Sequence, residues 1–133
     1  MSEFESDDIP HPAGELALQT IAMPKDANAT GDIFGGWLVS QMDLAGAVTA
    51  HKLAKGRVAT VAIDSMVFLN PVSIGSTVSC YTEVLKIGRS SMSIRVEVWS
   101  CPSTSVEQMK VTEGTFTFVA IDANRRTRPV PKN

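Results

Sequence analysis

Hydrophobic and polar residues alternate along most of the chain, which is the pattern of β-strands with one buried face. The clearest case is 91–99, where Met92, Ile94, Val96 and Val98 share one face and polar residues occupy the other. Four of these segments follow one another with short Gly, Pro or Ser connections, which favours an antiparallel sheet. The predicted strands cover residues 15–22, 58–69, 77–87, 91–99 and 111–121.

One segment departs from this alternation and predicts a long helix. Residues 34–55 contain no proline and are rich in Ala, Leu, Met and Gln, which indicates about five or six helical turns. Asp32 is a candidate cap at its start, and Gly56 is a candidate stop at its end. Small residues and few charges predict a helix buried nearly all round. The fold class is therefore α+β, with a curved antiparallel sheet wrapped around one central helix, and the sheet's exposed edge favours dimerisation.

The chain of 133 residues is long enough for one domain. Residues 1–13 form an acidic, disordered leader, 14–121 the domain, and 122–133 a basic tail that includes Arg126 and Arg128. Two interpretations of the tail stay open, a frayed solvated end and a contact with an anion.

Charge and composition exclude several classes of function. The net charge of −2 gives no support to nucleic-acid binding. No apolar run reaches the roughly 18 residues that a membrane span needs, and no signal peptide is visible, so we expect a cytoplasmic protein without a membrane partner. Cys80 and Cys101 fit this compartment as reduced, structural thiols.

Asp43 is the most informative residue, because it is the one ionisable side chain between positions 33 and 50. A carboxylate on a buried helix is costly unless it is paired or hydrated. No Lys or Arg lies three or four residues away, so Asp43 needs a partner from another element or a wet cleft. It either bonds a neighbouring backbone group or serves as a general base or nucleophile, and its isolation favours the catalytic role.

A polar loop runs from position 26 into the helix and ends at Gly35 and Gly36. Free N–H groups at a helix start favour negative charge, and two glycines allow a carbonyl to approach closely, as an oxyanion hole requires. The alternative is a packing or capping role for the glycines. Asn28 either orients substrate or bonds its own turn backbone.

Spacing places these two features apart within one chain. Asp43 lies seven residues beyond Gly36, about 10 Å along the helix axis. If two such helices pair antiparallel across a dimer axis, Asp43 of one chain meets the helix start of the other. The two histidines, His11 and His51, are poorly placed for a catalytic triad, and no motif for a metal or for nucleotide hydrolysis is present.

The run LALQTIAMPKDANATGDIFGGWLVSQMD resembles the acyl-CoA thioesterases of the hotdog fold, closest to the YciA type. The similarity continues through GRVATV, FLNPVSIGSTV, KIGRSSMSIRVEVW and TEGTFTFVAID and covers roughly residues 15–131. Thr30 stands where close relatives often have Asn. The resemblance implies a hotdog fold, a homodimer or a trimer of dimers, and hydrolysis of acyl-CoA to CoA and a free acid.

The resemblance also implies roles for individual residues. Asp43 carries the catalytic carboxylate, Asn28 comes from the partner chain, and the amides of Gly35 and Gly36 polarise the thioester carbonyl. CoA is part of the substrate, so no cofactor and no metal are expected. Residues similar to the family's segment near the CoA nucleotide are Gly88, Arg89, Ser90 and Ser91, and weaker candidates for phosphate contact are Arg126 and Arg128.

Two other functions remain as alternatives. A hotdog dehydratase or hydratase usually needs a histidine base, which this chain lacks at a suitable position. A non-catalytic acyl-CoA-binding hotdog protein would keep the pocket without the carboxylate, whereas Asp43 is present. The preferred acyl length depends on how Trp37, Met66 and Phe68 are oriented.

Overall fold

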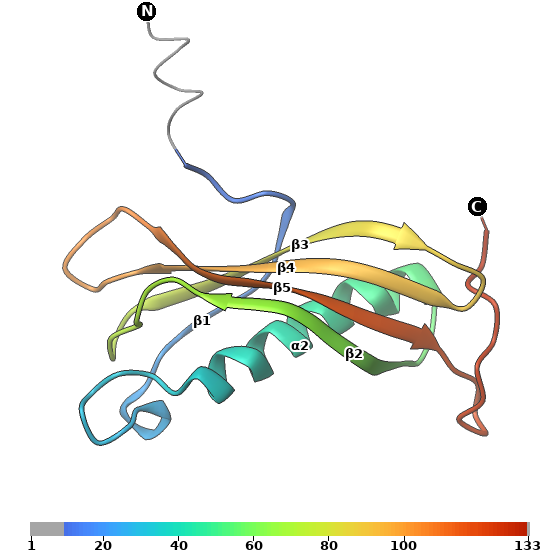
Figure 1. Ribbon diagram of the computed structural model, residues 1–133, viewed down its shortest axis with the longest axis horizontal. Coiled ribbons are helices and arrows are strands. Elements are labelled where there is room, and N and C mark those ends of the chain that lie inside the picture. The colour runs from blue at the N-terminus through green and yellow to red at the C-terminus, as the bar shows by residue number, and fades with distance from the viewer. Residues whose placement is uncertain (1–9, 133) are drawn as a thin grey trace, which may run out of the picture.

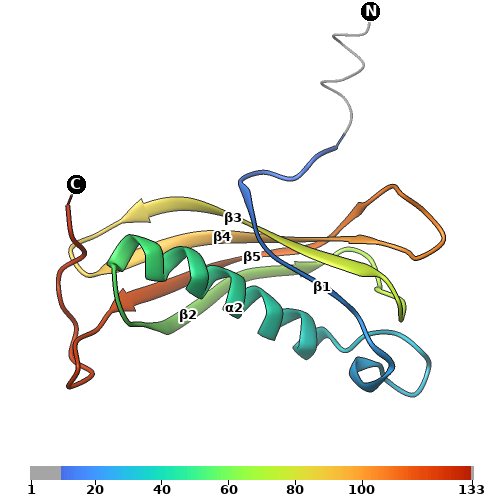
Figure 2. The same cartoon turned by 180° about the vertical axis from the view of Figure 1, so that it is seen from behind.

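A single sheet of five strands forms the body of the computed structural model, which describes residues 10–132. The spatial order is β1-β3-β4-β5-β2, and every neighbouring pair is antiparallel. One long helix, α2, lies diagonally across the concave face of the sheet (Figures 1 and 2). The elements are β1 (Glu15–Ile21), a short 3-10 helix η1 (Pro24–Asp26), α2 (Gly35–Ala54), β2 (Val58–Phe68), β3 (Thr77–Ile87), β4 (Ser91–Cys101) and β5 (Met109–Ala120).

The core lies between α2 and the inward face of the sheet. Period-two alternation directs the even-numbered apolar residues of β4 and β5 toward the helix, where Ile94, Phe116 and Phe118 are fully buried. Met42 fills the same layer from the helix. Gly46 lets the helix approach the sheet closely, because a Cβ built there would lie 2.8 Å from the ring of Phe118. The α+β prediction of a curved sheet around one central helix is confirmed.

Three local predictions about the helix are wrong. The residue at the N-cap is Phe34, with extended backbone and no side-chain cap, because Asp32 is held in the preceding loop. The helix ends at Ala54, and its C-cap is Lys55 rather than Gly56, because Lys55 adopts the left-handed conformation and donates its N–H to His51 O. The expected burial on nearly all sides fails because one sheet covers only one face, which leaves Leu44 54% exposed.

The C-terminal segment packs against the domain. Ile121 pairs with Thr127 in an isolated bridge, and Val130 is buried and donates its N–H to Arg89 O. The segment thereby runs beside the turn between β3 and β4, at the end of the sheet where α2 also ends (Figure 1). Of the predicted leader, residues 1–9 lie outside the described part of the chain.

Candidate functional site

The loop between η1 and α2 is closed on itself by hydrogen bonds. Asp26 is 8% exposed, its Oδ2 accepts the N–H of Met23, and its Oδ1 lies 3.1 Å from Lys25 Nζ. Its backbone carbonyl accepts the N–H of Phe34 at 3.0 Å, while Ala27 pairs with Ile33. These bonds fix the position at which the chain enters the helix.

Asn28 holds the same loop through its side-chain carbonyl. Its Oδ1 accepts the N–H of Thr30 at 3.0 Å, the hydroxyl of Thr30 at 2.8 Å and the N–H of Asp32 at 3.0 Å. The interpretation in which this residue bonds its own turn is therefore confirmed. Its amide –NH₂ has no hydrogen bond to the residues that the structure describes, so this group stays available as a donor.

The start of α2 offers two free backbone donors. The N–H groups of Trp37 and Leu38 both bond to Phe34 O, whereas those of Gly35 and Gly36 have no backbone acceptor within residues 10–132. The space at Gly36 is open, with no atom within 4 Å of where a Cβ would stand. Both N–H groups therefore carry the positive end of the helix dipole into accessible space, where they suit a developing negative charge.

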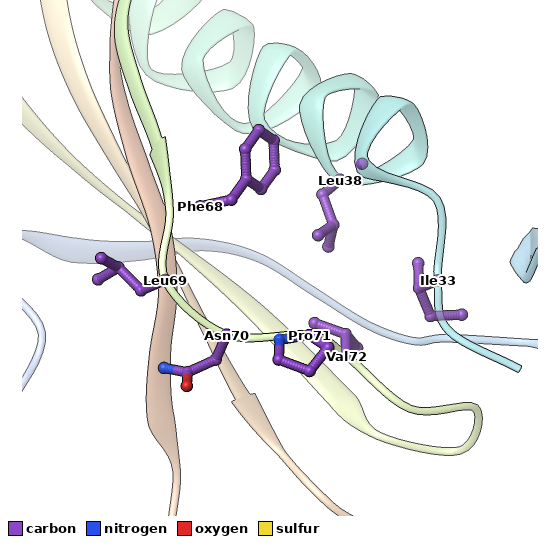
Figure 3. A pocket seen from close by; sticks show the side chains of 8 residues that line it. Ile33, Leu38, Phe68, Leu69, Asn70, Pro71 and Val72 are labelled. Atoms are coloured by element: carbon purple, nitrogen blue, oxygen red, sulfur yellow. The ribbon is translucent and has the colours of Figure 1, made fainter. Parts of the chain in front are cut away.

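An apolar hollow of about 290 Å³ opens beside these donors (Figure 3). The side chains of Ile33, Leu38, Phe68 and Val72 surround it, and Gly35 contributes the helix start to its wall. The ring of Phe68 lies 3.6 Å from the position that a Cβ on Gly35 would take. The hollow therefore reaches the first residue of the helix, Gly35, whose backbone N–H is free.

Asp43 lies farther along α2, with a partner on the neighbouring edge strand. Thr60 Oγ1 of β2 donates a hydrogen bond to Asp43 Oδ1 at 2.7 Å. Pairing between β2 and β5 shifts register between Thr60 and Ala62, an irregularity that sets the direction of the side chains next to it. The half-buried carboxylate is thus held by a hydroxyl from another element. The sequence predicted such a partner, because no Lys or Arg lies one turn away from Asp43 on the helix.

Thr60 is a residue of the candidate site that the sequence analysis missed. It stands 17 residues from Asp43, inside a strand whose Val and Ile residues carry the visible pattern. A threonine in a strand is ordinary. The contact arises only when β2 packs beside the helix, so no local signal could have identified it.

Within one chain, Asp43 and the helix start do not converge on a common point. The residues around the hollow include neither Asp43 nor Thr60. The strand β2 beside them is an edge strand that pairs only with β5 in the single chain, and it exposes Val61, Ile63 and Val67.

The residues expected near the CoA nucleotide lie at the opposite end of the sheet. Gly88, Arg89, Ser90 and Ser91 form the turn between β3 and β4, closed by the N–H of Gly88 donating to Ser91 O at 2.8 Å. A hollow of about 670 Å³ is lined by this turn and the C-terminal segment, and Arg89 and Lys132 contribute cations to its lining.

The two tail arginines have different environments. Arg126 is exposed, while its backbone N–H bonds to Asp122 Oδ1. The guanidinium of Arg128 donates to the carbonyl oxygens of Ala54 at 2.9 Å and Ile121 at 3.1 Å. Arg128 therefore covers the last turn of α2, where a cation also complements the helix dipole.

The histidine at the end of α2 and the buried cysteine of β3 lie in structural surroundings. His51 Nδ1 lies 2.8 Å from Gly56 O at the helix end. Burial raises the pKa of the Cys80 thiol to about 12, which keeps it protonated and unreactive. Cys80 and Cys101 are both free thiols, as predicted. Within residues 10–132, no three potential ligands cluster around a metal position.

The outer face of the sheet carries ion pairs remote from α2. Lys110 pairs with Glu113 and lies 3.6 Å from Glu97, and Arg95 pairs with Glu83. The hydrogen bond from Lys110 to Glu113 raises the pKa of that lysine above its usual value, with Glu97 adding to the effect.

No helix of the described chain has the length and apolar character to cross a membrane.

Comparison with known proteins gives consistent matches. Residues 30–106 match the family described as the thioesterase superfamily. The chain is 53% identical over 122 residues to an uncharacterised acyl-CoA thioester hydrolase of Haemophilus influenzae, covering 90% of this chain and 79% of that protein. It is 50% identical over 123 residues to acyl-CoA thioester hydrolase YciA of Salmonella typhimurium, covering 90% and 92%.

A solved structure is similar over the same range. It is a hexameric, broad-specificity acyl-coenzyme A thioesterase, crystallised as a variant with one aspartate replaced by alanine. The two chains are 52% identical with a TM-score of 0.88, and the match covers 91% of this chain and 89% of that one.

Proposed function

The chain belongs to the thioesterase superfamily, and from this premise we propose that it hydrolyses acyl-CoA thioesters to CoA and a free acid. The observation that carries the proposal is the pair of free N–H groups at Gly35 and Gly36, of which Gly35 also lines the apolar hollow. A thioester carbonyl that accepts from these donors would have its developing oxyanion stabilised as attack proceeds.

The catalytic site is shared by two copies of the chain. The free edge of β2 exposes apolar residues and unpaired backbone groups, which a second copy can cover by antiparallel pairing about a twofold axis. Their helices then run antiparallel, so that Asp43 of one copy approaches Gly35 and Gly36 of the other. The separation of about 10 Å within one chain makes this arrangement necessary for one carbonyl to meet both groups.

Asp43 supplies the reactive carboxylate, and Thr60 fixes its orientation through the hydrogen bond to Oδ1. In one route, the carboxylate takes a proton from water, and the resulting hydroxide forms the new C–O bond. In the other, the carboxylate attacks first and gives a mixed anhydride, which water then hydrolyses. Both routes break the C–S bond, and CoA leaves as the thiol once its sulfur takes a proton. That proton is the one held by Asp43 in the first route and comes from the hydrolytic water in the second. The amide –NH₂ of Asn28 is a further donor at the helix start.

We propose that the CoA nucleotide binds at the turn that contains Gly88, Arg89, Ser90 and Ser91, which is supported by the cation of Arg89 in the adjacent hollow. The exposed Arg126 stays a second candidate for phosphate contact. CoA enters as part of the substrate and water is the second reactant, so the reaction requires no separate cofactor. Since the solved relative is a hexamer, we propose a trimer of dimers for this chain. Its cytoplasmic location stays a prediction.

The test compares wild type with Asp43→Asn in an assay that detects the released CoA thiol. Asparagine keeps the shape and the carbonyl that accepts from Thr60, but it removes the charge and the base. We expect kcat to fall by at least ~100-fold at unchanged assembly, the scale of a lost catalytic group. The matched control is Ser40→Ala, one turn earlier on the helix, whose hydroxyl bonds only to Trp37 O and weakly to Gln41 in the described structure.

Three outcomes distinguish the alternatives. Equal activity of Asp43→Asn and wild type would make Asp43 structural and would refute the mechanism. Acyl-CoA binding without turnover by either protein would favour a non-catalytic binding protein. Activity on an enoyl or hydroxyacyl thioester without release of CoA would favour a dehydratase or hydratase.

A further inference from the structure

The apolar hollow beside the helix start differs in chemistry from the hollow beside the C-terminal segment. None of its eight lining residues is charged, and Asn70 is its one polar side chain. Its Nδ2 donates one hydrogen bond, to Lys110 O at 2.8 Å. The hollow beside the C-terminal segment contains Arg89 and Lys132 instead, which suits anions rather than a hydrocarbon.

The position of the hollow relative to the proposed oxyanion donors limits what can enter it. Gly35 both donates its N–H and forms part of the wall. A carbonyl bound at Gly35 therefore has one substituent within van der Waals reach of the Phe68 ring, which lies 3.6 Å from the Cβ position of Gly35. Figure 3 shows Phe68 and Leu38 facing this space, whereas Leu69 points to the other side of the strand.

We propose that the acyl chain of the substrate enters this hollow and that Phe68 determines which chain lengths are accepted. The inference rests on the proposed function, since the carbonyl at Gly35 is what directs the acyl chain there. The hollow holds about 290 Å³. This space has room for several methylene groups.

Phe68 is suited to this role because its ring lines the hollow and lies outside the buried core. It is 50% exposed in the single chain, so replacing it leaves the fully buried layer of Phe116 and Phe118 intact. Its backbone lies at the last position of β2, next to Thr112 of β5. A smaller side chain there enlarges the hollow, and a larger one shortens it.

The experiment measures kcat/KM for straight-chain acyl-CoAs from two to sixteen carbons with wild type, Phe68→Ala and Phe68→Trp. While methylenes still enter the hollow, each should raise kcat/KM by roughly fourfold. We expect Phe68→Ala to raise the ratio of long-chain to short-chain kcat/KM by at least about tenfold, and Phe68→Trp to lower it. The matched control is Ile74→Ala, an exposed apolar residue of the following loop that does not line the hollow.

A binding measurement separates this inference from the proposed function. The probe is an acyl-CoA analogue with a methylene between sulfur and carbonyl, which cannot be hydrolysed, prepared in the same chain lengths. Calorimetry should show the same shift in chain-length preference for the two Phe68 variants. If wild type binds with this preference but hydrolyses no acyl-CoA, the function fails and the pocket assignment stands.

Two results would overturn the inference. An unchanged chain-length profile in both Phe68 variants would show that the acyl chain lies elsewhere. An equal loss of affinity at every chain length would show that the hollow receives the pantetheine arm, which all the substrates share. A shift caused by Ile74→Ala would equally contradict the assignment to Phe68.

Discussion

The hydrogen bond between Thr60 and Asp43 should matter much more for the catalytic rate than for the stability of the fold. Thr60→Val removes the hydroxyl and keeps the branched shape that suits a strand. The side chain is exposed in the single chain, and its Oγ1 bonds only to Asp43 within the described residues. The substitution should therefore change the free energy of unfolding by less than about 1 kcal/mol.

The effect on catalysis should be much larger. A hydrogen bond to a charged group contributes about 1.5–3 kcal/mol, which corresponds to roughly 10- to 150-fold in rate if all of it serves to hold the reactive carboxylate. The assay is steady-state release of CoA, with kcat and KM determined separately. A loss in kcat at nearly constant KM is the signature of an interaction that acts in the transition state.

Two further variants serve as controls for this prediction. Thr60→Ser keeps the donor and should recover most of the lost activity. Thr117→Val makes the same chemical change on β5, on the face opposite to Phe116 and Phe118, and should leave kcat unchanged. Full activity of Thr60→Val, or equal losses in the Val and Ser variants, would refute the positioning role of the hydroxyl.

The other predictions concern the helix and the two ends of the site. Gly35→Pro deletes one free N–H at the first helical position, where proline is well tolerated. Activity should fall ~10²–10³-fold, whereas Gly35→Ala, which keeps the N–H, should lose far less. Gly46→Ala places a Cβ 2.8 Å from a buried ring and should cost about 1–3 kcal/mol in chemical denaturation. Arg128→Ala should lower stability by about 1–3 kcal/mol because the helix-end carbonyl loses its charged donor, with KM unchanged. Arg89→Ala should raise KM for acyl-CoA but not for acyl-pantetheine, which lacks the nucleotide.

Periodicity in the sequence was sufficient to predict the elements. Alternation along β4 is a local property of the chain, and its buried residues are those that the pattern indicates. The ends of α2 were harder to predict from the sequence, because they depend on which groups compete for the same hydrogen bonds. Asp32 has the chemistry of a cap, but its N–H bonds to Asn28 Oδ1 in the loop, and the helix begins after Phe34 without a side-chain cap.

The candidate site was predictable only where a residue violated a local rule. Asp43 was identified because a lone carboxylate on an apolar helix has no local partner. Thr60 violates no such rule, and its role depends on how β2 packs beside the helix. The structural use of Arg128 likewise arises from a contact with Ala54, 74 residues earlier in the chain.

The claim that two copies share each site is tested most directly by complementation. Asp43→Asn and Gly35→Pro, each nearly inactive alone, are coexpressed and purified together. With random pairing, half of the dimers are mixed and each mixed dimer contains one intact site, so about a quarter of wild-type activity should return. A coexpressed preparation no more active than the separate variants would show that Asp43 and Gly35 act within one chain, and it would contradict the account.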